Sequence, residues 1–335
     1  MAYTCCKFWT SAFYNVKQCS LCNFLRKNAR KLKITHAFCF FTPFVVLLSL
    51  SPRMSKRKAI LSEEESDFSI TQFHDSVSHF RKKEERALRI KIIPTKNFSD
   101  LISEIQYEDD YNELQLPEFD QGKIMTFLPT EHPNLKAHQK KFLNKLKLVL
   151  VNNSSVSSEP NFENLIDDLM VFLYEYMGFD DGENITMKPC NLRLSIADYS
   201  FTAHTDREGC RGTEIVWIMC EDKHIMSRTY KKGESQLICC MIAAYQYNYS
   251  ILDGRVYPPK LIGIRVVADR FYFYCIEESS EYIEDLFDGL PKKDLNVIKY
   301  PKEEGLSVAD PNERKHILNY LSSVKRYALT LEAKY

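Results

Sequence analysis

The sequence predicts a mixed α/β fold, with one sheet flanked by helices. Two segments, residues 163–177 and 234–247, carry apolar side chains at helical spacing. Between and after them lie short runs rich in β-branched and aromatic residues, which are typical of strands. The two kinds of segment follow the order helix, three strands, helix, two strands, helix. That order favours a sheet covered by helices over an all-helical or all-β protein.

The first helix and the three strands after it are the clearest elements. Residues 163–177 have the apolar periodicity of a helix, and Gly178 supplies a C-terminal stop. Residues 192–196 and 201–205 predict two strands around a turn. Residues 214–220 form a run rich in β-branched and aromatic residues, typical of a buried strand.

The later elements are predicted in the same way. Residues 234–247 form a helix whose expected buried face is made by Leu237, Cys240, Met241, Ala244 and Tyr245. Residues 261–267 and 271–276 predict a second hairpin. A short helix over 282–287 and a longer amphipathic helix over 311–331 complete the chain.

The region before this core is predicted to be a mostly helical accessory region, residues 67–153. Its expected helices cover residues 68–88, 98–105 and 138–151. A polar run, residues 152–158, has the composition of a linker. We therefore expect a separate α/β domain over residues 160–335.

The N-terminal segment differs sharply in charge from the rest. The formal net charge of the 335 residues is zero, but residues 1–53 hold eight basic and no acidic residues, which leaves the remainder at −8. We expect residues 1–66 to be a poorly ordered extension. Met54 begins a polar stretch that resembles an ordinary protein start, so residues 1–53 could be an upstream gene-model artefact.

Two other interpretations of the N-terminal segment stay open. The apolar run over residues 37–50 is shorter than the roughly 20 residues that span a bilayer, but it leaves membrane or secretory targeting as an alternative. Cys19 and Cys22 have zinc-like spacing without a second pair. The scattered cysteines after residue 189 suit a reducing compartment, so we expect an intracellular protein of the nucleus or cytoplasm.

The residues that point to chemistry are Asp206, Glu221 and Lys223. The two carboxylates fall near the ends of neighbouring predicted strands, and Glu221 and Lys223 project to one face because strand side chains alternate. Charges at the end of an apolar strand need partners or a metal. Oxygen ligands suit Mg²⁺ or Mn²⁺, and a nearby ammonium can hold an attacking water and stabilise charge on a phosphate.

This pattern resembles the PD-(D/E)XK nuclease superfamily. The family's Pro-Asp stands here as Thr205-Asp206, and its Glu-x-Lys as residues 221–223. The resemblance is closest to largely uncharacterised fungal proteins, some grouped with Crinkler-type effectors. They share a helix that begins near Glu-x-Gln-Leu, here residues 234–237, and the match covers roughly residues 160–300.

The resemblance implies a restriction-endonuclease-like fold and a metal-dependent nuclease acting on DNA or RNA. It implies that Asp206 and Glu221 ligate Mg²⁺ with help from the backbone carbonyl of Asp222, that Lys223 positions water, and that Gln236 lies beside the site. Glu163 is a weaker candidate from the first helix.

Plainer interpretations stand beside this one. Residues 221–223 could be a solvated strand end, and Asp206 could lie in a loop, with Asp198 as a rival acid in a turn. Gln236 could serve only the start of its helix. The alternative function is an inactive nuclease-like module that binds nucleic acid or a host protein. A membrane-tethered scaffold would depend on residues 37–50 alone.

Overall fold

The computed structural model describes residues 69–103, 111–154, 164–182, 184–222, 233–277 and 279–332. The extension expected over residues 1–66, with its apolar run, lies outside the described residues. Residues from Glu64 to Tyr335 form one compact unit. No helix within the described ranges is both long enough and apolar enough to cross a bilayer.

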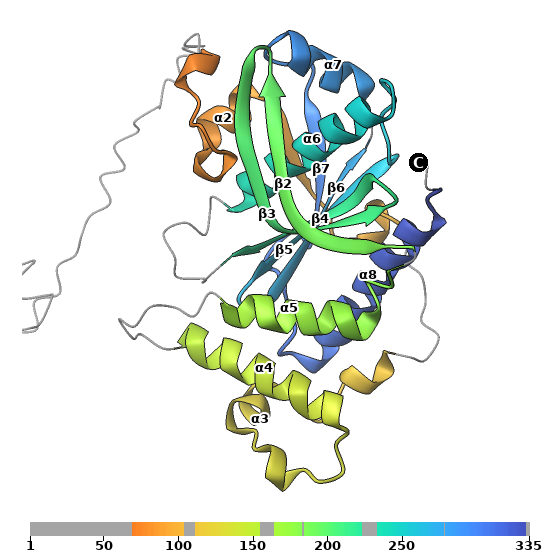
Figure 1. Ribbon diagram of the computed structural model, residues 1–335. Helices are drawn as coiled ribbons and strands as arrows, with labels where there is room; N and C mark the ends of the chain where they lie inside the picture. The colour runs from red at the N-terminus through yellow and green to blue at the C-terminus, as the bar shows by residue number, and fades with distance from the viewer. Residues whose placement is uncertain are drawn as a thin grey trace, which may run out of the picture. The chain divides into compact units, whose positions relative to one another are not determined.

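A mixed sheet flanked by helices forms the centre of this unit, as the sequence predicts (Figure 1). The sheet has eight strands, whereas the sequence predicts five. Its path is β1-β7-β6-β5-β4-β3-β2, with β8 paired to β6. The strands are β1 (Ile90–Pro94), β2 (Thr186–Ile196), β3 (Tyr199–Arg211), β4 (Glu214–Asp222), β5 (Lys260–Val267), β6 (Arg270–Glu277), β7 (Leu295–Tyr300) and β8 (Leu306–Ser307). Strands β4 and β5 are parallel, and so are β1 and β7.

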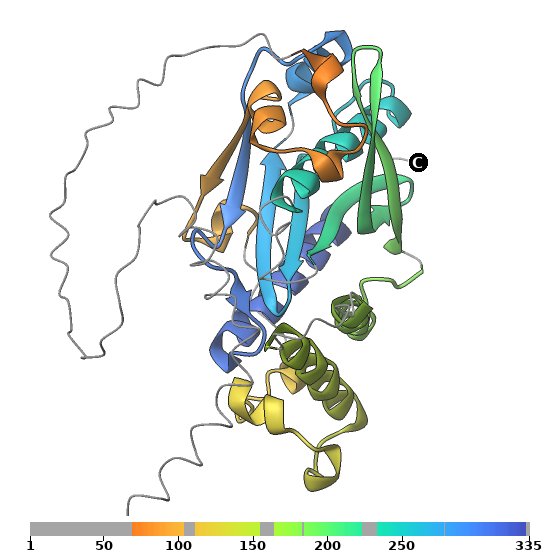
Figure 2. The same ribbon diagram turned by 90° about the vertical axis from the view of Figure 1, so that its left-hand side faces the viewer.

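Helices cover both faces of the sheet (Figures 1 and 2). One face, which we call the α5 face, shares a hydrophobic core with α4 (Ala137–Ser154), α5 (Asn164–Met177) and α8 (Pro311–Thr330). The other, the α6 face, packs on α6 (Gly233–Ile251) and α7 (Ser280–Asp288). Alternate strand residues divide between the two cores: Phe271 and Phe273 belong to the first, Tyr272 and Tyr274 to the second.

Helix α6 is the most deeply buried of these helices. It follows β4 and precedes β5, so it is the crossover that parallel neighbours require. The sequence predicts one buried face, but residues around the whole helix are buried. Gly263 of β5 permits this close packing, because a Cβ there would overlap the Met241 side chain of α6.

The described part of the N-terminal region differs from prediction. The helix expected over residues 68–88 is two 3-10 turns, Ile70–Gln72 and Val77–His79, followed by the short helix α2 (Lys82–Ala87). The helix expected over residues 98–105 is a 3-10 turn, Phe98–Asp100, in its described part. Serine caps and few helix-spaced apolar residues favour these short turns.

The N-terminal region is also part of the same fold rather than an accessory to it. Strand β1, which the periodicity does not predict, pairs in parallel with β7. Two further 3-10 turns, Asn112–Leu114 and Pro129–Glu131, and the short helix α3 (Gln121–Thr126) lead into α4. The boundary expected between residues 67–153 and 160–335 therefore does not separate two compact units.

One buried side chain joins the two regions. Arg314 of α8 is fully buried and donates hydrogen bonds to the carbonyls of Gln115, Leu116 and Phe119, at 2.7, 3.1 and 2.7 Å. It also donates to the carbonyls of Val308 and Ala309. Burial lowers the pKa of Arg314 to about 10.

Candidate functional site

The candidate site is built on an irregularity in β3. The sequence predicts that this strand ends at Thr205, but it continues to Arg211, so Asp206 lies within the strand. Thr205 pairs with Cys190 of β2, and Glu208 pairs with Lys188. Two residues of β3, Asp206 and Arg207, therefore lie opposite the single residue Pro189, which is a β-bulge. Proline has no N–H to donate to the ladder, which favours a bulge at this point.

The bulge places two charged residues together on the α5 face. Ala203 belongs to the α6-face core, so alternation assigns Thr205 to that face and Asp206 to the α5 face. Arg207 is also on the α5 face, because its guanidinium contacts Asp167 of α5. A second bulge lies in β4, where Val216 is the extra residue between the partners of Gly209 and Cys210. Val216 and its neighbour Trp217 both pack into the α5-face core.

Strand β4 brings the second predicted acid to the same place. Arg207 pairs with Met219, and Met219 accepts a hydrogen bond from the Tyr174 hydroxyl of α5. Position 221 is two residues further along β4, so alternation assigns it to the α5 face with Asp206. For Glu221 and Asp222 we describe the backbone alone. Lys223 lies outside the described residues, as do Glu163, His224 and the basic residues Arg228, Lys231 and Lys232.

Two residues that the sequence did not single out, Asp167 and Arg207, complete the described part of this corner. The Arg207 Nη2 atom lies 3.4 Å from the Asp167 Oδ1 atom. Asp167 is in the first turn of α5, where an acid is favoured by the helix dipole. The one signal that could have pointed to the bulge is Pro189, which interrupts an otherwise strand-like run.

Helix α6 reaches the bulge through Gln236. Its Nε2 atom donates a hydrogen bond of 2.9 Å to the carbonyl of His204, two residues before Asp206. Gln236 therefore lies next to β3, with its amide bound to backbone. Asn248 acts similarly at the second bulge, where it bonds both the N–H and the carbonyl of Ile215.

The rival acid, Asp198, lies far from the bulge. It is in the two-residue turn between Ile196 and Tyr199, next to Ala197, whose φ of 48° is left-handed. Asp198 precedes Asp206 by eight residues, which is about 26 Å along an extended strand. The structure therefore places Asp206, and not Asp198, next to β4.

A second charged group lies on the α6 face, at the start of α6. Glu234 accepts hydrogen bonds from Lys299 Nζ at 2.6 Å and from the Tyr274 hydroxyl at 2.8 Å. Arg265 is buried and its guanidinium lies over the Tyr272 ring. Burial raises the pKa of Glu234, but Lys299 and Tyr274 outweigh burial and hold it below its ordinary value. Glu234 and Lys299 form a neutral pair, and their bonds, with that of the Tyr274 hydroxyl, anchor α6 to β6 and β7.

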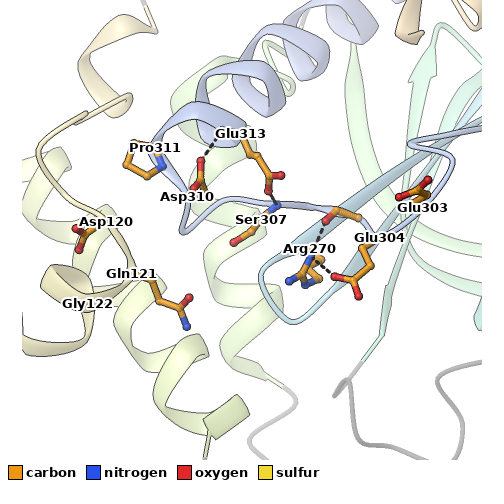
Figure 3. A pocket seen from close by; sticks show the side chains of 11 residues that line it. Asp120, Gln121, Gly122, Arg270, Glu303, Glu304, Ser307, Asp310, Pro311 and Glu313 are labelled. Carbon is orange, nitrogen blue, oxygen red and sulfur yellow. Dashed lines mark hydrogen bonds and ion pairs between the residues drawn. The ribbon is translucent and has the colours of Figure 1, made fainter. Parts of the chain in front are cut away.

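An acidic hollow of about 810 Å³ lies near the start of α8. Figure 3 shows the side chains that line it. Most of its carboxylates already accept a hydrogen bond from a backbone N–H or form an ion pair with a neighbouring side chain. Asp310 caps α8, Glu313 accepts from the Ser307 N–H, and Arg270 contacts Glu304 at 3.2 Å. None of the residues predicted for the site lines this hollow, so it is not the candidate site.

The described donor set fits a hard divalent cation only in part. Asp206 and Asp167 supply carboxylate oxygens, the ligand type that Mg²⁺ prefers. Within the residues described here, no group of three His, Cys, Asp or Glu side chains is close enough to hold a metal. The carboxylates predicted to complete the set, at positions 221 and 222, are outside the side chains described.

The chain matches no protein-family model, and no curated protein matches it. The case for the site therefore depends on its own residues: the bulge at Asp206 and Arg207, the neighbouring end of β4, and the first turn of α5.

Proposed function

We propose that this protein is a metal-dependent nuclease that hydrolyses phosphodiester bonds of DNA or RNA. The observation that carries the proposal is the β3 bulge. It puts the carboxylate-bearing residue Asp206 on the same face as position 221 of β4, which the Asp, Glu-x-Lys pattern requires. The resemblance to PD-(D/E)XK nucleases supports the same assignment.

In this proposal different residues of the chain bind the metal, position the attacking water and hold β3 in place. Asp206 and Glu221, with the carbonyl of Asp222, hold Mg²⁺ or Mn²⁺, because their oxygens are hard ligands. The bound metal would acidify water and offset charge on the phosphate. Lys223 orients the attacking water and stabilises developing negative charge through its ammonium. Gln236 keeps β3 in place by its bond to the carbonyl of His204.

The test is cleavage of end-labelled DNA and RNA oligonucleotides by the full chain, with Mg²⁺ or with EDTA. We compare wild type with Asp206→Asn and Lys223→Ala, and use Asp198→Asn as the matched control on the same hairpin. Wild type and Asp198→Asn should cleave only with metal, and the other two variants should be slower by about 100-fold or more.

Two results would contradict the proposal. If Lys223→Ala gives the same products at the same rate as wild type, the cleavage belongs to a contaminant or to another site. If no form cleaves any substrate, the enzyme assignment is wrong. Binding without cleavage would favour the inactive nucleic-acid-binding module instead. Circular dichroism of each variant confirms that it is folded.

A further inference from the structure

We infer that Arg207 is the phosphate-contacting residue of the candidate site. It would bind a non-bridging oxygen of the nucleic-acid backbone at the phosphate next to the scissile one. This inference rests on the proposed function, and it concerns a residue that the Asp, Glu-x-Lys pattern does not include.

The placement of Arg207 follows from the bulge. Asp206 and Arg207 share one register position opposite Pro189, so the candidate metal ligand and a guanidinium are adjacent on the α5 face. Arg207 also pairs with Met219, two residues before position 221. A phosphate held between the two predicted acids would therefore have the Arg207 side chain beside it.

Arg207 has unused donors. A guanidinium carries five N–H groups in a planar fork. The contact with Asp167 uses one nitrogen at 3.4 Å, and the Nε atom is buried without a hydrogen-bond partner in the described structure. The side chain as a whole is 27% exposed, so part of the guanidinium is accessible to a ligand.

The ion pair with Asp167 orients the Arg207 guanidinium but is weak enough for a ligand to replace it. Asp167 is 45% exposed, and an ion pair this exposed contributes little to stability. A phosphate can therefore take the place of the carboxylate. Arginine suits this role because its fork matches two phosphate oxygens, whereas a lysine ammonium acts as a point charge.

The charge of the chain makes a local cation necessary. The sequence after residue 53 carries −8, which repels nucleic acid at long range. The described residues of β4 include no basic side chain, and Arg207 of β3 is a described cation beside the predicted acid Asp206. Phosphate contacts carry no base information, so Arg207 should affect all sequences, and DNA and RNA, alike.

The test is binding of fluorescein-labelled oligonucleotides to the full chain in EDTA, by anisotropy over a series of salt concentrations. We compare wild type with Arg207→Ala and Arg207→Lys. Arg193→Ala is the matched control, because Arg193 is exposed on β2 and bonds Ser200. Arg207→Ala should weaken binding about tenfold and reduce the slope of log Kd against log salt by about 0.7–0.9.

Arg207→Lys should keep the salt slope, because the charge remains, but bind more weakly, because the fork is lost. Arg193→Ala should match wild type in both measures. If Arg207→Ala binds like Arg193→Ala, the inference is overturned. If Arg207→Ala does not fold, Arg207→Lys decides: affinity equal to wild type overturns the inference, and weaker binding on an unchanged slope supports it.

Cleavage by the same proteins separates this inference from the proposed function. Binding that depends on Arg207 in a protein that never cleaves would support the inference and reject the enzyme assignment. Cleavage by wild type with the same KM and salt slope in Arg207→Ala would do the reverse. A wild-type chain that neither binds nor cleaves nucleic acid overturns both.

Discussion

Replacing Arg314 by methionine should destabilise the whole compact unit, because this side chain joins residues 111–120 to α8. The guanidinium is fully buried and donates to five backbone carbonyls, those of Gln115, Leu116, Phe119, Val308 and Ala309. Methionine has a similar length and fills much of the space, but it donates no hydrogen bond.

The magnitude follows from two opposing terms. Hydrogen bonds from a charged donor contribute about 1.5–3 kcal/mol each, so five would sum to roughly 8–15 kcal/mol if they were independent. Removing the buried cation also recovers a desolvation cost of several kcal/mol. We therefore expect Arg314→Met to lower the free energy of unfolding by about 3–5 kcal/mol, the balance between the lost hydrogen bonds and the recovered desolvation cost.

The assay is equilibrium unfolding in urea, followed by far-ultraviolet circular dichroism. Arg326→Met is the matched control, because Arg326 is exposed on the same helix, and it should change the free energy of unfolding by less than about 0.5 kcal/mol. A loss below about 1 kcal/mol for Arg314→Met would refute the argument. So would a wild-type chain in which residues 69–154 unfold in a separate transition.

Three further predictions concern the sheet and its irregularities. Gly209→Ala should destabilise the protein by about 1–3 kcal/mol, because a Cβ there would overlap the Trp217 indole. At the control position, a Gly122 Cβ would come no closer than 3.4 Å to the Asp120 side chain, so Gly122→Ala should be tolerated in urea unfolding. Asn248→Ala should cost about 2–3 kcal/mol by the same assay, since it leaves the N–H and carbonyl of Ile215 without their side-chain partner; Asn191→Ala, at an exposed position of β2, is its control. The pKa of Glu234 is lowered from 4.5 in the folded protein. Its ion pair therefore stabilises the fold above that pH, and this stabilisation is lost as the pH falls through the folded-state pKa. The difference in urea midpoint between wild type and Glu234→Gln should shrink below pH 4.5 and stay constant above it.

The sequence predicts the elements whose side-chain pattern is local. Helix α5, strands β2 to β6 and helices α6 to α8 all show an apolar period or an apolar run of the correct length. Strands β1 and β7 are short, mixed in polarity and about 200 residues apart in the chain. Strand β1 is at the edge of the sheet and pairs with β7, which pairs with β6 on its other side. Their pairing depends on tertiary contacts that no local pattern carries.

The topology determines where two of the predicted residues lie in the sheet. Asp206 and Glu221 lie on neighbouring antiparallel strands, as the spacing predicts. Asp167 and Arg207 were missed because each is an ordinary charged residue in its local context. Only the packing of α5 against the bulged part of β3 makes them neighbours.

Without the bulge, Asp206 and residue 221 would point to opposite faces of the sheet. In a regular antiparallel pair with Arg207 opposite Met219, Asp206 would lie opposite residue 220, and residue 221 would point to the other face. A single inserted residue reverses the face of everything beyond it. With the insertion at Asp206 and Arg207, both residues share the face of position 221. A functional Asp, Glu-x-Lys pair at this spacing therefore requires the bulge. Pro189, which lies opposite the bulge in β2, therefore helps to determine the face on which Asp206 lies.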